Sequence, residues 1–445
     1  MNIARTAIAK IAGAKPFDSA DIAEWRAHWR IVIGAAIGMG TGIGLYLLVA
    51  SLFITHVTKE FGWSRGDIGI AGMVGFVTGA LVLPILGQLL DRFGFRRVVL
   101  VCTPALALLY LGAALQSGFY GFYLALTVWG GIFGGGTGAL AYTRPVVAAF
   151  HRQRGLALGV ATAGTSIAAL FVPSLLAGII AAYGWRAGFY ALAVIALGVG
   201  MPIALVLIGR AREGVARASD DVPDSEHVTS RSMTVREALR DSRFWLIALA
   251  LMAVNIPGSG VVGQLAPMIS DKGLSPGAVA MVMSIYAVGL LAGRLVTGFS
   301  LDRLPAPKVA AVMTFIPAIG ISLLLIPAPS FALAALAVGM MGLQQGSEID
   351  LIAYFVSRSF GLKHYSSIYG LIATAGATST AIALVLFGKI HDLTGSYDIA
   401  LMVGTVGFCI GAAAFAAIGQ VRPALSTPLF RAPQGEVDPR DIAKK

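Results

Sequence analysis

Long apolar runs occupy most of the chain, and short polar segments separate them. Each run has about 20 or more residues, the length that an α-helix needs to cross the roughly 30 Å hydrocarbon core of a bilayer. The pattern therefore predicts twelve transmembrane helices, six on each side of a polar segment at 210–243. We expect them at about 31–56, 67–90, 97–116, 120–148, 155–183, 187–209, 244–270, 276–300, 307–328, 330–358, 365–391 and 396–419.

The polar segments divide the chain into five parts. We expect an all-α membrane protein in which two six-helix bundles, at 31–209 and 244–419, are joined by a linker at 210–243 and flanked by tails at 1–30 and 420–445. The middle of the linker is acidic. Near its end, Thr234-Val-Arg-Glu237 has the pattern of a capping box, which predicts a short surface helix before the seventh span.

Lysine and arginine are distributed unevenly between the two sides of the predicted membrane. Of the 33 such residues, 26 fall in the segments on the side of the tails, 5 fall on the other side, and Arg144 and Arg294 lie within spans. Because basic loops stay in the cytoplasm, both termini are expected to be cytoplasmic, in the inner membrane of a cell. The net charge of +11 then faces the anionic leaflet of the lipid bilayer, so it does not imply a nucleic-acid partner.

The composition excludes several classes of protein. Only 12% of the residues are charged and 57% are hydrophobic, whereas soluble domains carry about 25% charged residues. The two cysteines, Cys102 and Cys409, both fall in apolar runs and predict neither a disulfide framework nor a cysteine-based metal site. The HExxH pattern of zinc peptidases and the Walker A pattern of nucleotide-binding proteins are both absent from the sequence. We therefore expect a protein that is not an enzyme and that uses no cofactor or metal.

The two halves of the chain repeat each other. Gly87-Gln-Leu-Leu-Asp91-Arg92 recurs 211 residues later as Gly298-Phe-Ser-Leu-Asp302-Arg303, so the second and eighth spans match without a gap. Ala161-Thr-Ala-Gly164 recurs 212 residues later as Ala373-Thr-Ala-Gly376. A parallel repeat of six spans is typical of secondary transporters, which form their central site between the two halves.

Several motifs carry a resemblance to a known family. The segment Gly87-Gln-Leu-Leu-Asp91-Arg92-Phe-Gly94-Phe-Arg96-Arg97 resembles the loop signature of the major facilitator superfamily. Gly155-Leu-Ala-Leu-Gly-Val-Ala-Thr-Ala-Gly164, Tyr183-Gly-Trp-Arg186 and Gly293-Arg294 are similar to segments of the monocarboxylate transporters and the bacterial oxalate:formate antiporters. The resemblance covers almost the whole chain and implies two bundles that rock around a site at mid-membrane, in a protein that works as a monomer.

The sequence also departs from these relatives at two places. The lysine that oxalate-type antiporters carry in the eleventh span is absent, and that helix has only hydroxyl side chains, at Thr374, Thr378, Ser379 and Thr380. Leu290 stands where animal monocarboxylate carriers have an acid one turn before the arginine of the eighth span. The missing lysine disfavours dicarboxylates as substrates.

Arg294 is the principal candidate for substrate binding. It precedes Asp302 by eight residues, which places it about 12 Å inside the membrane from the end of its helix. An ionisable side chain at such depth is costly and usually functional. A guanidinium offers a two-pronged donor that fits a carboxylate. The alternative is a structural arginine that binds helix carbonyls and never contacts substrate.

Glu348 and Asp350 are the candidates for proton coupling. Asp350 precedes Arg358 by eight residues, so it lies at about the same depth as Arg294. Because the two acids are two residues apart, they point about 200° away from each other, and only one is expected to face the cavity. The sequence does not distinguish which one. The alternative is a fixed ion pair that joins the eighth and tenth spans.

Other polar side chains within the spans could orient a substrate. Tyr286 lies two turns from Arg294 on nearly the same face, and Arg144 lies near the cytoplasmic end of the fourth span. For Arg144 the alternative is a side chain that extends to the headgroups. For the others it is an interhelical hydrogen bond. The full set of candidates is Arg294, Tyr286, Arg144, Tyr46, Asn255 and Gln264.

The repeated loop motif suggests a conformational role. By the resemblance, its residues hold the cytoplasmic ends of neighbouring helices together in one conformation and release them in the other. An acid can do so by interacting with the N-terminus of a neighbouring helix. The alternative is that these charges only set the topology. The residues concerned are Gly87, Asp91, Arg92, Arg96, Arg97, Asp302 and Arg303.

These predictions combine into one functional hypothesis. We expect a secondary active transporter that moves small organic monocarboxylate anions by alternating access and proton symport, in which a proton on Glu348 or Asp350 frees Arg294 to take the anion. Two alternatives stay open. One is an anion exchanger (carboxylate antiport) that needs no proton, and the other is an exporter of amphiphilic compounds.

Overall fold

The computed structural model describes residues 18–209, 232–327 and 329–421, and within this part of the chain the regular structure is helical, with no strand. The acidic middle of the predicted linker and most of both predicted tails lie outside the described residues. Each of the twelve predicted ranges is largely helical, as expected from its apolar run. The all-α prediction is confirmed.

The first half of the chain forms helices up to residue 209. They are α2 (Ser19–Gly40), α3 (Ile43–Val49), α4 (Ser51–Phe61), α5 (Arg65–Ala114), α6 (Tyr120–Gly134), a 3-10 turn at Gly135–Thr137, α7 (Ala139–Ala149), α8 (Arg154–Tyr183) and α9 (Trp185–Val194), which continues through a π-helical turn at Ile195–Gly200. The second half contains α11 (Val235–Arg240), α12 (Ser242–Gly263), α13 (Leu265–Asp271), α14 (Pro276–Leu301), α15 (Ala306–Leu323), α16 (Phe331–Phe360), α17 (Tyr365–Thr394) and α18 (Asp398–Ile418).

Three local features decide where helices begin and break. Thr234 caps α11 through a capping box with Glu237, which confirms the predicted surface helix. Helix α5 contains two predicted spans, and the backbone leaves helical geometry between them at Gly94, whose φ of 79° favours glycine. The first predicted span is bent by 42° between α2 and α3. There a Cβ on Gly42 would lie 1.9 Å from the carbonyl oxygen of Thr137, so only glycine fits.

Eight helices among the described residues are long and apolar enough to cross a membrane, or nine if the bent pair α2 and α3 is one span. Helix α5 enters that count once, although it covers two predicted spans. Helices α16 and α17 cover the tenth and eleventh predicted spans and are not among the eight. Helix α16 carries the candidate acids Glu348 and Asp350, and these lower its hydropathy.

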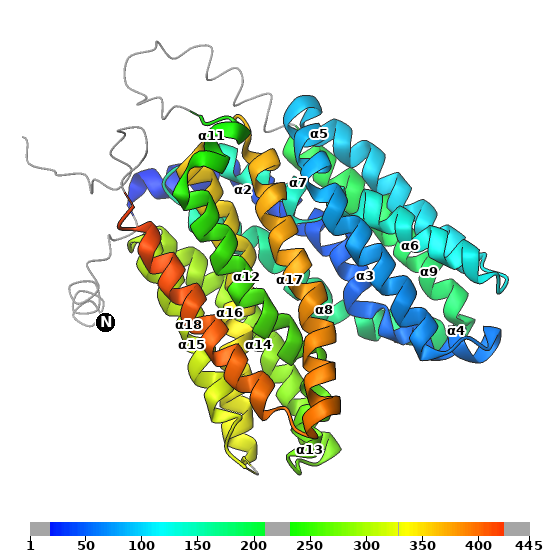
Figure 1. The fold of residues 1–445 in the computed structure, drawn as a ribbon. Coiled ribbons are helices and arrows are strands. Elements are labelled where there is room, and N and C mark those ends of the chain that lie inside the picture. The colour runs from blue at the N-terminus through cyan, green and yellow to red at the C-terminus, as the bar shows by residue number, and fades with distance from the viewer. Residues whose placement is uncertain (1–17, 210–231, 328, 422–445) are drawn as a thin grey trace, which may run out of the picture.

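The helices form two bundles, one from each half of the chain (Figure 1). One hydrophobic core lies within the first half, around Phe53 and Phe189, and another lies within the second half, around Phe387 and Phe408. A third core includes residues of both halves. The bundles meet at the end of the molecule that carries Asp91 and Asp302, which we call the closed end. They diverge toward the opposite end, the open end, where α4 and α13 lie (Figure 1).

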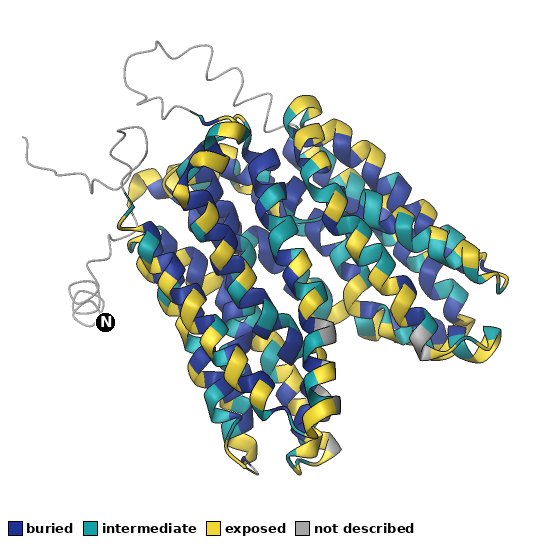
Figure 2. Ribbon diagram, in the orientation of Figure 1, coloured by how far each residue is buried: buried dark blue, intermediate teal, exposed yellow. Residues whose placement is uncertain are grey.

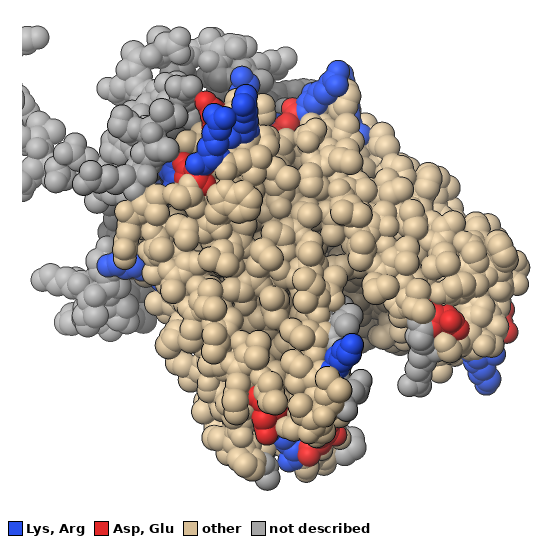
Figure 3. Space-filling model, viewed as in Figure 1, with Lys and Arg blue, Asp and Glu red and all other residues tan. Residues whose placement is uncertain are grey.

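The surface is that of a protein embedded in lipid. Exposed positions run along the outer faces of both bundles (Figure 2). The exposed residues include large apolar side chains such as Leu81 and Leu170. In the view of Figure 3 the charged side chains gather at the two ends, and the broad middle of the surface is uncharged. This face also has a notch between the two bundles at the open end (Figure 3).

Candidate functional site

Glycines bring α14 and α16 into close contact at the level of Arg294. A Cβ on Gly293 would lie 2.0 Å from the carbonyl oxygen of Leu343, and one on Gly346 would lie 2.1 Å from that of Leu290. Small residues of this kind let helix backbones approach closely within membranes. The packing places Arg294 of α14 and Asp350 of α16 in the same layer, between the two bundles.

Arg294 is buried, with 5% of its surface exposed. Its Nε donates a hydrogen bond of 3.0 Å to Oγ of Ser166, which lies on α8 in the other bundle. Its Nη1 has no hydrogen-bond partner among the described residues. A buried guanidinium nitrogen without an acceptor is costly, so this atom is available to an incoming acceptor group.

Asp350 is fully buried, and like Arg294 it forms a hydrogen bond to α8. Its Oδ1 accepts a hydrogen bond of 2.7 Å from Oγ1 of Thr162, one turn of α8 before Ser166. Its Oδ2 has no partner among the described residues. The ion pairs found among those residues do not include one between Arg294 and a carboxylate, so the direct pair that matched depth suggested is not formed in this conformation. The two charges are nevertheless close enough to interact electrostatically.

Glu348 belongs to a different polar group. Its carboxylate accepts hydrogen bonds from Nδ2 of Asn255 at 2.8 Å and from Nε2 of Gln345 at 3.1 Å. Asn255 in turn accepts from Oγ1 of Thr380 at 3.1 Å. These partners lie on α12, α16 and α17, all in the second bundle. Glu348 is thus held within its own bundle, whereas Asp350 contacts the other bundle, as expected for residues about 200° apart.

Three residues that the sequence did not single out join this site. Thr162 and Ser166 hold the two charges, and Tyr369 of α17 lies in electrostatic range of Arg294, as does the predicted Tyr286. One signal was present in the sequence. Thr162 matches Thr374 in the repeat, and Thr374 also contacts the opposite bundle, through a hydrogen bond of 2.9 Å to the carbonyl oxygen of Ala80.

At the closed end, the two repeated aspartates contact helix N-termini of the opposite bundle. Asp302 accepts hydrogen bonds from the backbone N–H groups of Gly155 at 2.6 Å and Leu156 at 2.7 Å, at the start of α8. Asp91 accepts from those of Ser366 at 3.1 Å and Ser367 at 2.8 Å, at the start of α17. Each carboxylate thus caps a helix of the other half. Burial raises the pKa of Asp302 to about 7, against the lowering effect of these N–H donors and of nearby arginines.

The other residues of the loop motif lie around these contacts. Gly87 allows the bundles to touch, because a Cβ there would lie 2.2 Å from the carbonyl oxygen of Ser366. Arg303 donates a hydrogen bond of 3.1 Å to the carbonyl oxygen of Phe299, and Arg92, Arg96 and Arg97 are exposed. Arg144 donates a hydrogen bond to the carbonyl oxygen of Leu90 and lies 3.5 Å from the carboxylate of Asp91. It therefore belongs to the closed end rather than to the Arg294 site.

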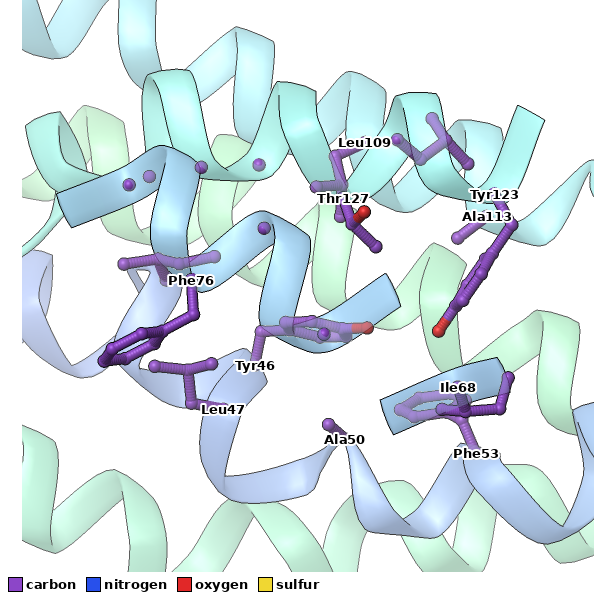
Figure 4. Close-up of a pocket in the computed structure, with 18 of the residues that line it drawn as sticks. Tyr46, Leu47, Ala50, Phe53, Ile68, Phe76, Leu109, Ala113, Tyr123 and Thr127 are labelled. Carbon is purple, nitrogen blue, oxygen red and sulfur yellow. The ribbon is translucent and has the colours of Figure 1, made fainter. Parts of the chain in front are cut away.

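Two predicted residues lie elsewhere. Gln264 lies at the junction of α12 and α13, toward the open end, and accepts a hydrogen bond of 3.2 Å from the hydroxyl of Tyr397. Tyr46 lines a separate, apolar cavity in the first bundle (Figure 4). No cluster of three or more His, Cys, Asp or Glu side chains that could hold a metal ion occurs in the described part of the chain. The structure thus places Asp350, Tyr286 and Glu348 within electrostatic range of Arg294, joins Asn255 to Glu348, and separates the other candidates from this site.

Comparison with known proteins identifies the family. The sequence model of the Major Facilitator Superfamily matches residues 32–384, more than three quarters of the chain. The chain belongs to the Major Facilitator Superfamily. It is therefore a multi-pass membrane transporter and not an enzyme, and the predicted two-bundle fold is confirmed.

Individual members of the superfamily are similar over most of their length. Monocarboxylate transporter 13 of Bos taurus is 23% identical over 380 residues, which are 84% of this chain and 85% of the relative. Monocarboxylate transporter 11 of Homo sapiens is 25% identical over 416 residues, 88% and 83% of the two chains. Among solved structures, the Escherichia coli transporter FucP in an outward conformation aligns with a TM-score of 0.66 at 14% identity, over 88% of this chain and 98% of FucP.

Proposed function

We propose that this member of the superfamily carries small organic monocarboxylate anions across the inner membrane by alternating access and proton symport. The observation that carries the proposal is the buried Arg294, which lies between the bundles with Nη1 unpaired among the described residues. A carboxylate would supply the missing acceptor and match the guanidinium in charge and geometry. The names of relatives that align over most of the chain agree with this substrate class.

Asp350 is the proposed site of the coupling proton. It is fully buried, and it forms a hydrogen bond to α8, the helix to which Arg294 is also bound. Its Oδ2 has no hydrogen-bond partner in the described structure. In the empty carrier, ionised Asp350 offsets the charge of Arg294. In the loaded carrier, the proton neutralises Asp350 and the substrate anion takes over that role. The net charge of the site is the same in both states, so neither buries an uncompensated charge when the bundles rock.

The closed end is proposed to be the cytoplasmic side, because it carries the basic loops. In the conformation described, Asp91 and Asp302 join the bundles at this end. The carrier would then be open toward the outside, with Arg294 and Asp350 near the bottom of the opening. Rocking of the bundles would break these contacts and expose the site to the cytoplasm.

Transport by purified protein in proteoliposomes tests the proposal. Uptake of labelled lactate should be driven by an inwardly directed proton gradient in the wild type. Asp350→Asn should abolish this gradient-driven uptake but retain exchange of internal for external lactate, because the fixed neutral group mimics the protonated state. Glu348→Gln, which alters a carboxylate held within one bundle, is the matched comparison. If gradient-driven uptake survives in the Asp350→Asn, Glu348→Gln double variant, proton coupling through these acids is wrong.

An anion exchanger is the second candidate. It is favoured by the absence of an ion pair between Arg294 and a carboxylate in the described structure, since an arginine without a bound counter-ion can pass from one anion to another. An exchanger predicts that uptake requires a substrate anion inside the vesicle at every pH. Uptake into vesicles that contain no substrate anion distinguishes the two mechanisms.

A further inference from the structure

A large apolar cavity lies in the first bundle, away from the charges of the Arg294 site. It has a volume of about 510 Å³ and is lined by α3, α4, α5, α6 and α9, with Ala377 as the contribution of α17 from the second bundle. Aromatic side chains, including Tyr46, Phe53 and Tyr123, surround it (Figure 4). None of the described residues that line it is charged.

The few polar groups in the lining are largely bound to the protein itself. The amide of Gln116 donates to the carbonyl oxygen of Phe119, the hydroxyl of Thr127 donates to that of Leu124, and Nε1 of Trp185 donates to Glu60. The hydroxyl groups of Tyr46 and Tyr123 point toward one another (Figure 4). The cavity therefore offers an apolar ligand contact surface and offers water few partners.

The inner end of this cavity is level with Arg294. Leu83, a lining residue, precedes Asp91 by eight residues, just as Arg294 precedes Asp302, so the 211-residue repeat makes Leu83 the counterpart of Arg294. The carbonyl oxygen of Leu83 packs against Gly370, where a Cβ would lie 2.6 Å from it. Gly370 follows Tyr369, which is in electrostatic range of Arg294. The apolar wall thus contacts the segment of α17 that lies within electrostatic range of the cation.

We propose that this cavity binds the apolar body of the substrate, so that the preferred substrates are aryl or similarly bulky monocarboxylates rather than two- or three-carbon acids. The inference rests on the proposed function, in which Arg294 binds the carboxylate. The volume argues for it, because about 150 Å³ of apolar cavity suffices for benzene, and this cavity is more than three times larger. A short acid would leave most of the apolar lining in contact with water, which is unfavourable.

Lactate and 3-phenyllactate, which differ by one phenyl ring, provide the test. Full-length protein in proteoliposomes should take up phenyllactate with a KM at least about tenfold below that for lactate, the usual minimum gain from filling a hydrophobic pocket. Gly72→Leu fills the cavity, since Gly72 lines it and has open space where a side chain would go. This variant should raise the KM for phenyllactate toward that for lactate, by a much larger factor than it changes the KM for lactate.

Gly178→Leu is the matched control, because Gly178 on α8 also has open space around it but does not line the cavity. It should change neither KM. Equal KM values in the wild type, or equal effects of Gly72→Leu on both acids, would overturn the inference while leaving the proposed function intact. If a lipid acyl chain fills the cavity instead, Gly72→Leu should change neither KM, and this outcome would also overturn the inference.

Ligand-induced thermal stabilisation separates this inference from the proposed function. A ligand that binds the folded protein raises its Tm whether or not it is transported. If the wild type takes up neither acid, but phenyllactate raises the Tm and Gly72→Leu removes that shift, the apolar site stands and the proposed function fails. If neither acid is taken up and phenyllactate produces no shift in the wild type, both fail.

Discussion

Arg294 and Asp350 are bound to the same face of α8 rather than to each other. Nε of Arg294 lies 3.0 Å from Oγ of Ser166, and Oδ1 of Asp350 lies 2.7 Å from Oγ1 of Thr162, four residues earlier on that helix. Helix α8 belongs to the first bundle, whereas α14 and α16 belong to the second. Both hydrogen bonds therefore cross the surface along which the bundles would rock, and they link the charge state of the site to the closed conformation.

Thr162→Val should weaken that conformation. Valine keeps the shape of threonine but cannot donate to Asp350, and a hydrogen bond to a charged group contributes about 1.5–3 kcal/mol. The substitution Leu301→Cys, in a background without Cys102 and Cys409, introduces a thiol that is accessible only when the bundles separate. We expect alkylation of this cysteine to become at least about tenfold faster. Leu301 is 2% exposed, and its Cβ would lie 2.8 Å from a Cβ on Gly155 of the other bundle.

Thr165→Val is the control for this substitution. The hydroxyl of Thr165 donates to the carbonyl oxygen of Thr162 within α8, and among the described residues it forms no hydrogen bond to the other bundle. Its replacement should leave the alkylation rate near that of the parent. Equal rates for the two variants would mean that the Thr162 hydrogen bond does not hold the bundles together.

Arg294→Lys tests whether the geometry of the guanidinium matters in addition to its charge. Lysine keeps the charge but loses the two-pronged donor that fits a carboxylate. We expect kcat/KM for uptake to fall about 100-fold, since roughly one charged hydrogen bond of 1.5–3 kcal/mol is lost. Arg240→Lys, at an exposed position on α11, should have no effect. Uptake at the wild-type rate in Arg294→Lys would exclude two-pronged binding.

The sequence predicted the position of these residues along their helices but not their partners. Eight-residue spacings to Asp302 and Arg358 correctly placed Arg294 and Asp350 in one layer, because helical rise is constant. Depth alone does not determine the direction in which a side chain points across a bundle interface. The hydroxyls of α8 were therefore missed, and in place of the direct ion pair that the sequence left open as an alternative, the structure has two hydrogen bonds to a third helix.

Local signals were more informative than long-range ones. The capping box at Thr234 predicted α11 because its partners lie three residues apart. The break at Gly42 was not predicted, because its cause is the close approach of Thr137 from another helix. The 211-residue repeat, in contrast, gave a correct prediction for residues far apart in the sequence. It paired Asp91 with Asp302, and each carboxylate caps a helix of the opposite bundle.

Asp91→Asn should open the closed end. The carboxylate of Asp91 accepts from two backbone N–H groups and from the hydroxyl of Ser367, and it lies 3.5 Å from Arg144. Loss of its charge weakens all of these interactions, each by about 1 kcal/mol or more, and removes the ion pair with Arg144. Alkylation at Leu301→Cys should therefore become faster. Asp302 forms no such ion pair among the described residues and its burial disfavours the charged form, so loss of charge acts in the opposite direction there. Asp67→Asn, which alters an acid in the first turn of α5 toward the open end, is the matched control and should leave the rate unchanged.

The closed end should also respond to pH through Asp302. Burial raises its pKa from 3.8 to about 7 in this conformation. A carboxyl group that separates from the other bundle into water returns to its ordinary value, so the closed conformation binds the proton more tightly than the opened one. Protonation therefore favours closure. This stabilisation is fully present below the ordinary pKa and is lost as the pH rises through about 7.

Lowering the pH on the side of the closed end from 8 to 6 should accordingly slow the opening that exposes Leu301→Cys, by about tenfold for a single group. Thiol reactivity itself falls over this range, so the rate must be divided by that of the Asp302→Asn variant, whose amide does not titrate and whose neighbours Arg358 and Arg303 are kept. We expect the ratio of the two rates to fall by about tenfold from pH 8 to pH 6. A ratio that stays constant over this range would show that Asp302 does not exchange a proton when the bundles separate.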